Sequence, residues 1–553
     1  MKTDNLQSAN NDISADYDCS VYDYLCRKNQ GFGDFPSLVY YGKTISYSRM
    51  LSIIDTMANI LKSAGVKKGD VVVVSLPAIP EAVYLFYAIN KIGAVFCGMD
   101  CRSSAEEIEV TVNTVHPKLC FIADFHFKEF RNCNSVPLVY IRSTETIGGF
   151  TRVGGVFADF FTGRMIQKLR MDNVYTYKEF ISQYSGKVSS LTESVSGDDI
   201  CAYFYTSGTT YGRKCVVLTN KNINSAVLQH SKAQVDIKRG NTFSNIMPLF
   251  TCYGITIGTH LPLCLGLKVN LVPLFNPKNM KKLITESGSS FIITVPAHWE
   301  YFIKDSFADC DLSYFKAAIV GGDRVEPEYE NKIKSIMKKC GSEGRVLIGY
   351  GLTETASTAV TPPVETPMGS VGKAMSLTDV RIFSTETGEE SACMEKGEIC
   401  ISGPSVCKGY LNDKEATDTL LRKHKDGKVW LHSGDIGYMD AEGYVFFCER
   451  IKRMYVRFDG TKVSPYSIEQ VIKQCPVVSR CLVLAVKDTK HTHGKCAKAV
   501  IVLKNTQDVQ SAKLICEKFI TQNLPEFMRP EEVAFVDRLP VTKNGKVDYF
   551  AEN

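Results

Sequence analysis

The stretch FYTSGTTYGRKCV, residues 204–216, concentrates hydroxylated, glycine and basic residues in one short segment. Ser and Thr hydroxyls donate hydrogen bonds to anions, and glycines let the backbone approach an anion closely with successive N–H groups pointing at it. A lysine ammonium adds a compact positive charge. The stretch therefore predicts a loop that binds phosphate. The residues that supply these groups are Thr206, Ser207, Gly208, Thr209, Thr210 and Lys214.

The spacing of this loop differs from that of a Walker phosphate loop. A Walker loop has the pattern G-x4-G-K-[ST], whereas here three residues separate Gly208 from Gly212, and Cys215 follows Lys214. The loop therefore belongs to another class of phosphate site. Taken alone, a polar turn that binds no ligand remains an alternative.

Apolar runs that suit buried strands alternate with helical patterns on the N-terminal side of the loop. The run DVVVVS (70–75) precedes two stretches with helical spacing, one from Pro80 to Gly93 and one from Glu106 to Val115. This alternation is typical of a parallel sheet covered by helices on both faces.

The same alternation returns after the loop. The segments FIITVP (291–296), AAIVGG (317–322) and VLIGYG (346–351) each predict a strand that ends in a loop. Because ligands of such sheets bind at the carboxyl ends of the strands, these loops are candidate site segments. Residues 365–447 change to short strands with glycine turns, which predicts a β subdomain, and the C-terminal part predicts shorter mixed elements.

Length and composition indicate a multidomain globular protein. A chain of 553 residues exceeds the size at which single cores stop growing, and 44% hydrophobic with 23% charged residues is ordinary for a soluble enzyme. A net charge of +5 is too small to indicate binding to nucleic acid or to an anionic membrane. The most apolar stretch, Ile255–Phe275, contains His260, Pro262, Lys268 and Pro273, so it predicts buried core and no membrane span.

The N-terminus and the cysteine usage favour the cytoplasm. The first twenty residues are polar and lack the apolar core of a secretory signal. The 20 cysteines include no C-x2-C pair, which argues against a zinc ribbon or a thioredoxin-like site. We therefore expect reduced thiols and a cytoplasmic location.

Five motifs occur in the order of a known family. YTSGTTYGRKCV (205–216) resembles the signature Y-T-S-G-T-T-G-x-P-K-G-V, and GYGLTET (349–355) matches Y-G-x-T-E. GEICISGPSVCKGYLND (397–413), WLHSGDIGYMDAEGYVFFCERIKRM (430–454) and LPVTKNGKVD (539–548) match the later signatures. The chain thus resembles the adenylate-forming superfamily of acyl-CoA synthetases, adenylation domains and luciferases, from about residue 30 to the C-terminus.

The resemblance implies an α/β fold with two domains. The large N-terminal domain, residues 1–450, would bind AMP and consist of two parallel-sheet α/β subdomains plus a β subdomain. The small, mobile α+β domain, residues 451–553, would carry the adenylation lysine, and Lys452 would be the hinge between the two domains.

The resemblance also implies a two-step reaction that uses ATP, Mg²⁺ and CoA. A carboxylate attacks the α-phosphorus of ATP to give an acyl-adenylate and pyrophosphate, and a thiol then displaces AMP. Because both reactants of the first step are anions, stabilisation of phosphate charge is the main requirement. The catalytic residues implied are Lys546, Thr353, Glu354 and Lys214, and Glu354 would hold the Mg²⁺.

The resemblance places a nucleotide site around the same residues. The phosphate loop would hold the β- and γ-phosphates, and Thr353 would bond the α-phosphate. Asp435 would accept hydrogen bonds from both ribose hydroxyls, and Arg450 would contact ribose and phosphate. The residues implied to surround adenine are Gly321, Gly322, Asp323, Gly349, Tyr350 and Gly351.

The chain departs from the family pattern within the phosphate loop. Tyr211, Arg213 and Cys215 replace the usual Gly, Pro and Gly, whereas the hydroxyls and the lysine remain. Tyr211 tolerates a positive φ poorly, but Gly212 could shift the turn by one residue, and Arg213 could add charge near the pyrophosphate. A non-catalytic nucleotide-binding relative therefore stays an alternative.

The acid is expected to be apolar, for example a fatty acid. In MPLFTCYGIT (247–256), Thr251 stands where amino-acid-activating domains usually place the Asp that pairs with an ammonium. However, the segments LPEFMRP and NGKVD match the sequences of peptide-synthetase adenylation domains, so an enzyme that loads a carrier protein is the alternative to a CoA ligase. The expected pocket residues are Phe250, Thr251, Tyr253, Val295 and His298.

Overall fold

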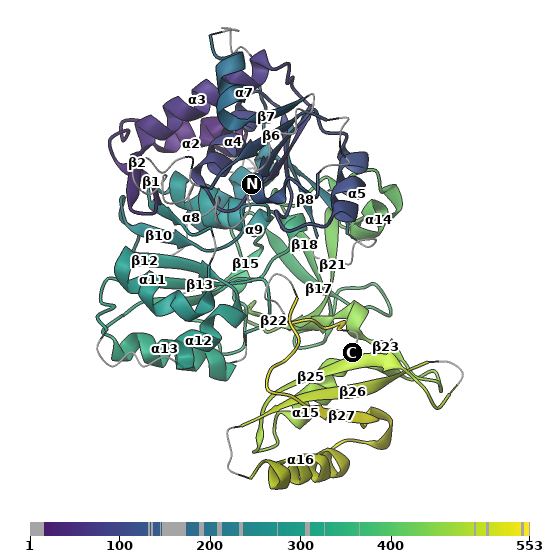
Figure 1. The fold of residues 1–553 in the computed structure, drawn as a ribbon. Helices are drawn as coiled ribbons and strands as arrows, with labels where there is room; N and C mark the ends of the chain where they lie inside the picture. Colours follow the sequence, from purple (N-terminus) through teal and green to yellow (C-terminus); the bar gives the residue numbers. More distant parts are fainter. Residues whose placement is uncertain are drawn as a thin grey trace, which may run out of the picture.

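Figure 1 shows a large domain, coloured purple to green, and a smaller yellow-green domain on one side of it. This computed structural model of the chain describes residues 16–130, 133, 136–143, 145, 173–186, 193–206, 213–231, 236–273, 275–304, 310–325, 327–363, 365–491, 494–504, 508–542 and 547–551.

An eight-stranded sheet forms one half of the large domain, with the strand order β19-β9-β8-β4-β3-β5-β6-β7. The strands are β3 (Val71–Ser75), β4 (Val95–Gly98), β5 (Leu119–Ala123), β6 (Leu138–Ile141), β7 (Val174–Thr176), β8 (Ile200–Tyr205), β9 (Cys215–Thr219) and β19 (Gly409–Tyr410). Strands β3 to β8 pair in parallel, whereas β9 runs antiparallel to β8 and β19 runs antiparallel to β9.

Both faces of this sheet are buried, which explains its unbroken apolar strands. In β3, Val71 and Val73 belong to one core cluster and Val72 and Val74 to another. Successive side chains of a strand point to opposite faces, so only a continuously apolar strand suits a sheet that is covered on both sides. The buried strand predicted at residues 70–75 is confirmed.

A second, seven-stranded sheet has the order β14-β13-β12-β10-β11-β1-β2. The strands are β1 (Pro36–Tyr40), β2 (Lys43–Ser46), β10 (Thr242–Asn245), β11 (Lys268–Leu271), β12 (Ser289–Thr294), β13 (Ala317–Val320) and β14 (Arg345–Ile348). All pairs are parallel except the β1–β2 hairpin. The strands predicted within 291–296, 317–322 and 346–351 are confirmed as β12, β13 and β14.

Helices cover these sheets, and local sequence signals determine where they begin. They are α2 (Val21–Lys28), α3 (Tyr47–Ser63), α4 (Pro80–Lys91), α5 (Ala105–Val115), α7 (Tyr177–Tyr184), α8 (Asn220–Ser231), α9 (Cys252–Ile255), α10 (Leu261–Cys264), α11 (Met280–Ser287), α12 (Trp299–Lys304), α13 (Pro327–Lys339) and α14 (Lys414–Leu420). The Ser46 side chain caps α3, and Pro80 opens α4 because it has no N–H group to leave unpaired. Ser104 and Glu107 form a capping box at the start of α5.

The apolar stretch Ile255–Phe275 is buried core, as predicted. It includes the last residue of α9, a π-helical turn (Thr256–His260), α10 and β11, and His260 is fully buried. Within the described ranges, no helix combines the length and the hydropathy that crossing a membrane requires.

A five-stranded antiparallel sheet confirms the predicted β subdomain. The strands are β17 (Asp379–Phe383), β18 (Gly397–Ser402), β20 (Leu421–Lys423), β21 (Val429–Met439) and β22 (Val445–Arg450), and a separate pair is β15 (Val360–Thr361) with β16 (Lys373–Ala374). Strand β21 pairs with β18, β20 and β22, so the HSGD motif lies inside this sheet.

The C-terminal domain is an α+β unit with its own core. The elements are β23 (Tyr455–Val456), β24 (Lys462–Val463), α15 (Pro465–Ile472), β25 (Val478–Lys487), β26 (Lys495–Leu503), α16 (Val509–Asn523) and β27 (Glu532–Phe535). Tyr455, Ile468, Ile501 and Cys516 belong to a core cluster separate from those of the large domain. The yellow C-terminal segment lies against the large domain in Figure 1. The boundary at residue 450 stays a prediction.

Candidate functional site

Predicted site residues follow the carboxyl ends of parallel strands in both large sheets. Thr206 follows β8, Val295 follows β12, Gly321 follows β13 and Gly349 follows β14. In open α/β sheets this edge is where ligands bind, because the loops there converge on one crevice. The topology therefore gathers segments that are far apart in the chain.

Three of the residues predicted to bind nucleotide are in direct contact. Tyr350 Oη donates a hydrogen bond to Asp435 Oδ2 at 2.8 Å, and Arg450 Nε lies 3.0 Å from Asp435 Oδ1. Asp435 and Arg450 are cross-strand partners of β21 and β22. Asp435 is only 1% exposed, and this burial raises the pKa of its carboxyl to about 6, against the lowering effects of Arg450 and Tyr350.

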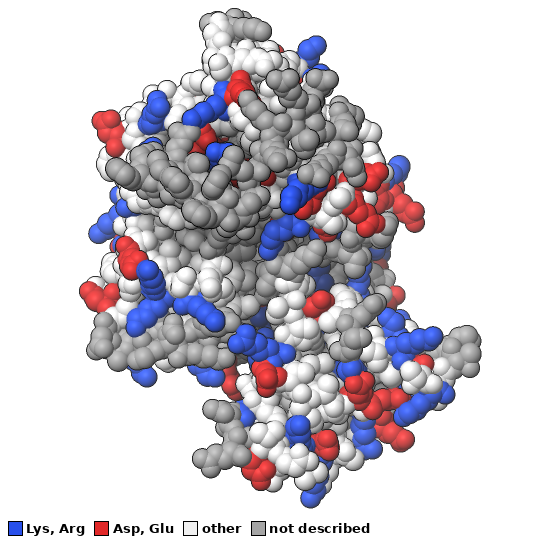
Figure 2. Space-filling model, viewed as in Figure 1, with Lys and Arg blue, Asp and Glu red and all other residues white. Residues whose placement is uncertain are grey.

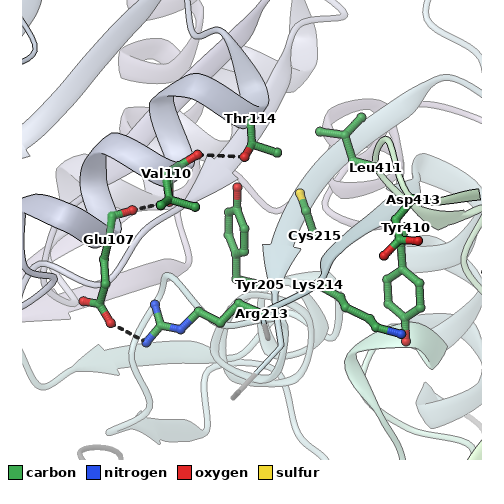
Figure 3. Close-up of a pocket in the computed structure, with 11 residues that line it drawn as sticks. Glu107, Val110, Thr114, Tyr205, Arg213, Lys214, Cys215, Tyr410, Leu411 and Asp413 are labelled. Atoms are coloured by element: carbon green, nitrogen blue, oxygen red, sulfur yellow. Dashed lines mark hydrogen bonds and ion pairs between the residues drawn. The ribbon is translucent and has the colours of Figure 1, made fainter. Parts of the chain in front are cut away.

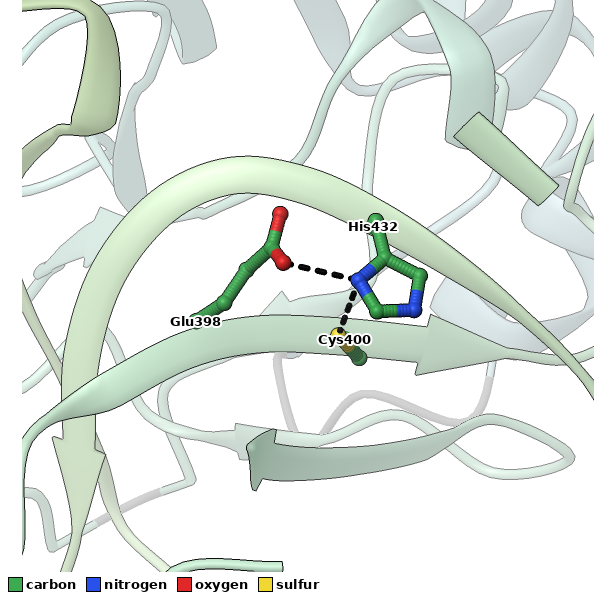
Figure 4. A group of neighbouring side chains, drawn as sticks. All are labelled: Glu398, Cys400 and His432. Atoms are coloured by element: carbon green, nitrogen blue, oxygen red, sulfur yellow. Dashed lines mark hydrogen bonds and ion pairs between the residues drawn. The ribbon is translucent and has the colours of Figure 1, made fainter. Parts of the chain in front are cut away.

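A cluster of Glu398, Cys400 and His432 lies beside this group (Figure 4). Glu398 Oε2 is 2.7 Å from His432 Nδ1, and Cys400 Sγ is 3.5 Å from the same nitrogen. Glu, Cys and His are all metal ligands. However, a nitrogen–oxygen distance of 2.7 Å fits a hydrogen bond in which Nδ1–H donates to the carboxylate. That proton occupies the atom a metal would need, so we interpret the cluster as a hydrogen-bonded support.

The same cluster holds the backbone next to Asp435. Glu398 Oε1 accepts a hydrogen bond from Gly434 N–H at 2.8 Å, and His424 Nε2 lies 3.0 Å from His432 Nε2. Sequence reasoning missed this support. A usable signal was present, because Glu398 and Cys400 are two residues apart on a strand and therefore share one face.

The base of the phosphate loop is closed by two hydrogen bonds. Thr206 N–H donates to Lys214 O at 3.0 Å, and Lys214 N–H donates to Thr206 Oγ1 at 3.1 Å. The other predicted loop residues, Ser207, Gly208, Thr209 and Thr210, lie outside the described residues.

Lys214 and Glu354 meet at a residue that the sequence did not single out. Tyr410 Oη donates to Glu354 Oε1 at 2.7 Å, and Lys214 Nζ lies 4.6 Å from the centre of the Tyr410 ring (Figure 3). Glu354 is 8% exposed and lies with Thr353 in a short 3₁₀ turn (Thr353–Thr355). The structure thus brings together two predicted catalytic residues through one aromatic ring.

Arg213 takes a different partner from the pyrophosphate considered above. Its Nη2 lies 3.0 Å from Glu107 Oε1, and Glu107 Oε2 accepts a hydrogen bond from Ser104 N–H at 2.9 Å (Figure 3). One carboxylate therefore caps α5 and pairs with Arg213. A pocket of about 90 Å³ lies here, and Glu107, Arg213, Lys214 and Cys215 are among its lining residues.

The C-terminal segment reaches the large domain at Asp323. Asp323 Oδ2 accepts a hydrogen bond from Val547 N–H at 3.0 Å, and Asp323 Oδ1 accepts one from Tyr549 Oη at 3.0 Å. Lys546 precedes Val547 in the chain and lies outside the described residues. Val547, which follows the predicted adenylation lysine, is therefore hydrogen-bonded to Asp323, a residue predicted to border adenine.

The predicted hinge lies between the domains. Lys452 is the middle residue of a 3₁₀ turn (Ile451–Arg453) that follows β22. Its neighbour Arg453 forms a buried ion pair with Glu469 of α15. The hinge role of Lys452 stays a prediction.

The predicted acid pocket offers little polarity. The Thr251 hydroxyl accepts a hydrogen bond from Gly254 N–H at 3.1 Å and donates one to Pro248 O at 2.8 Å. Its hydrogen bonds are therefore made with the backbone. Burial lowers the pKa of His298 to about 4, so its ring is neutral at pH 7, and it packs 5.2 Å from the Phe275 ring.

The remaining pocket residues pack closely on the backbone. Tyr253 Oη donates a weak hydrogen bond to Thr294 O at 3.4 Å, and a Cβ added at Gly321 would lie 2.9 Å from Tyr253 Oη. Phe250 O would lie 2.6 Å from a Cβ at Gly98, and Val295 is fully buried. Gly321 and Gly98 are thus positions where a side chain would not fit without movement.

Two family models match the chain. Residues 25–411 match the model described as AMP-binding enzyme, and residues 467–546 match the model described as AMP-binding enzyme C-terminal domain. Lys546 is the last residue of the second match.

Curated relatives and solved structures are similar over most of the chain. A long-chain-fatty-acid–CoA ligase of Bacillus subtilis is 27% identical over 528 residues, covering 93% of this chain and 91% of the relative. A probable 4-coumarate–CoA ligase 1 of Dictyostelium discoideum is 29% identical over 470 residues, covering 84% and 81%.

Among solved structures, the anthranilate CoA ligase AuaEII in complex with anthranoyl-AMP has a TM-score of 0.79 at 19% identity, covering 96% of each chain. ATP-bound MatB from Rhodopseudomonas palustris has a TM-score of 0.77 at 21% identity, covering 96% of this chain and 97% of that one. These likenesses establish the two-domain α/β fold.

Proposed function

Since the chain belongs to the AMP-binding enzyme family, we propose that it is a carboxylate–CoA ligase that acts through an acyl-adenylate. In the first step, a carboxylate oxygen attacks the α-phosphorus of ATP, and pyrophosphate leaves. In the second step, the thiol sulfur of CoA attacks the acyl carbon, and AMP leaves. The printed names of the relatives, which are CoA ligases, support this reaction class.

The contact group at Asp435 carries the proposal. A buried carboxylate held between Tyr350 and Arg450 offers acceptors for two ribose hydroxyls, and Arg450 adds positive charge on the same side. Asp435 is only 1% exposed, and burying a carboxylate costs free energy. An ion pair at the surface would avoid this cost. We therefore assign this group to the nucleotide.

Other predicted residues would stabilise the phosphate charge. Lys214 and the hydroxyl of Thr206 would bind the terminal phosphates, Thr353 would bond the α-phosphate, and Lys546 would approach both the α-phosphate and the substrate carboxylate. These groups would lower the repulsion between the two anions.

Glu354 has the chemistry of a Mg²⁺ ligand. Its Oε1 accepts from Tyr410, and no described residue donates a hydrogen bond to Oε2, which leaves a hard oxygen for a hard cation. Bound Mg²⁺ would supply charge neutralisation to the phosphate oxygens.

The acid is proposed to be a fatty acid or another largely apolar acid. The Thr251 hydroxyl is occupied by the backbone, and His298 is neutral at pH 7, so neither residue offers a charge to a polar substrate. A buried ammonium without a carboxylate partner would be costly, which disfavours an amino acid. Aromatic acids remain within this class.

A panel of acids tests this proposal. ATP–pyrophosphate exchange is measured with fatty, aromatic and amino acids, and thioester formation is then measured with free CoA and with a holo-carrier protein. We expect exchange with apolar acids and thioester with CoA. Exchange with none of the acids would identify a non-catalytic relative, and transfer to the carrier alone would identify a carrier-loading enzyme.

The affinity for the nucleoside is expected to weaken below about pH 6. The carboxyl of Asp435, whose pKa is about 6, is ionised above this pH and accepts both ribose hydroxyls. Below it, protonation removes an acceptor and the attraction to Arg450, so the Kd should rise about tenfold per pH unit. Adenosine is the suitable probe, because it carries no phosphate that titrates in this range.

The matched control is Asp435→Asn. This variant should bind adenosine more weakly than the wild-type protein at pH 8 and with no pH dependence between pH 5 and 8. An unchanged pH profile in the variant would assign the titration to another group.

A further inference from the structure

Tyr410 is fixed in place by backbone pairing from two directions. In β19 it lies opposite Val216 of β9, two residues after Lys214. Cys407 N–H donates to Glu354 O at 2.8 Å, so the segment that leads to Tyr410 is also tied to the turn that carries Glu354. The ring is therefore held between the phosphate loop and this turn.

The two functional contacts of Tyr410 use different parts of its side chain. The hydroxyl donates to Glu354 Oε1 at 2.7 Å, whereas the ring lies 4.6 Å from Lys214 Nζ. A cation near an aromatic ring is attracted by the ring's electron distribution, and a hydroxyl beside a carboxylate orients one of its oxygens.

The side chain of Tyr410 also contacts two opposite charges that form no ion pair with each other. Among the ion pairs of described residues, none includes Lys214, and Glu354 accepts from a neutral phenol instead of an ammonium. If the two charges paired directly, each would neutralise the other before phosphate or metal arrived. A neutral ring with a donor at one end keeps both charges close and available.

We propose that Tyr410 is a positioning residue that orients Glu354 towards the metal of Mg·ATP and holds Lys214 for the phosphates. The proposal rests on the proposed function and adds a residue to it. Tyr410 does not touch the reacting atoms, so its removal should change the magnesium requirement and the affinity for ATP.

Two substitutions separate its two contacts. Tyr410→Phe keeps the ring near Lys214 and removes the donor to Glu354. The loss of such a supporting contact typically costs 10- to 100-fold in metal affinity, so the Mg²⁺ concentration for half-maximal ATP binding should rise by about this factor. Tyr410→Leu also removes the ring, and at saturating Mg²⁺ it should raise the Kd for ATP by a further 2- to 30-fold or so.

The readout is ATP binding by calorimetry over a series of Mg²⁺ concentrations, without acid or CoA, so that no turnover occurs. The matched control is Tyr444→Phe. The Tyr444 ring lies 4.2 Å from Lys373 Nζ, and its hydroxyl donates to the backbone O of Glu365 at 2.7 Å, so a ring–ammonium contact and a hydroxyl hydrogen bond occur there without a carboxylate partner. This control should keep the wild-type magnesium dependence.

The outcomes distinguish this inference from the proposed function. Absence of Mg·ATP binding in the wild-type protein would overturn the proposed function itself. If the wild-type protein binds Mg·ATP and a folded Tyr410→Phe variant shows the same magnesium dependence, only the proposed role of Tyr410 is overturned. Thermal unfolding checks each fold, and if Tyr410→Leu does not fold, Tyr410→Phe decides alone.

Discussion

Substitution of Lys546 by Ala is expected to lower ATP–pyrophosphate exchange by about 100- to 1,000-fold, because removal of one preorganised electrostatic contact to developing charge typically costs this much. The adjacent Val547 donates a hydrogen bond at 3.0 Å to Asp323, a residue predicted to border adenine. In the proposed mechanism, only the first step needs this charge. Thioester formation from supplied acyl-adenylate should therefore be retained.

Both half-reactions are measured on the same preparation, by isotope exchange and by thioester yield from the adenylate. Lys518→Ala is the matched control, since this lysine is exposed on α16 of the same domain. The control should keep both activities. Equal loss of the two steps in Lys546→Ala would contradict a lysine that serves adenylation alone.

Substitution of Glu469 by Leu is expected to destabilise the C-terminal domain by about 3–5 kcal/mol, the usual cost of leaving one partner of a buried ion pair uncompensated. The pair with Arg453 is almost fully buried, with exposures of 5% and 6%. Glu469 Oε1 also accepts a hydrogen bond from Val483 N–H at 2.8 Å, so the substitution leaves a second group unpaired. Amide hydrogen exchange in β25 and β26 measures the effect within this domain.

An exposed pair of the same domain serves as the comparison. Lys490 and Glu531 form an ion pair in which Lys490 is 67% exposed and Glu531 is 27% exposed, and Glu531→Gln should change the stability by less than about 1 kcal/mol. Similar effects of the two substitutions would show that the Arg453–Glu469 pair is not a main support of the C-terminal domain.

The layered fold could be predicted because its signals are local. A sheet buried on both faces requires apolar runs such as Val71–Val74, and capping residues such as Ser104 mark a helix start within a few positions. The predicted strands at residues 70–75 and 317–322 and the predicted helix over 106–115 agree with β3, β13 and α5. Each depends on a pattern shorter than about twenty residues.

The contacts within the site could not be predicted in the same way. Tyr410 reaches Glu354 and Lys214 only because β19 pairs with β9. This pairing joins segments that are nearly two hundred residues apart, so no local pattern in the sequence indicates it. Arg213 was considered as a phosphate contact because of its neighbours in the chain, yet the fold brings Glu107 of α5 within 3.0 Å of it. Motif matching identifies which residues take part, whereas topology decides which side chains meet.

Two hydrogen bonds on Asp323 contribute to holding the C-terminal segment against the large domain. Bonds to a charged group contribute roughly 1.5–3 kcal/mol each, and Asp323 accepts one from Val547 and one from Tyr549. A preference of a few kcal/mol is within the range that unequal ligand affinities can invert. We therefore expect the docked arrangement of this segment to be one side of a reversible equilibrium, which ligands that bind the two arrangements unequally would shift.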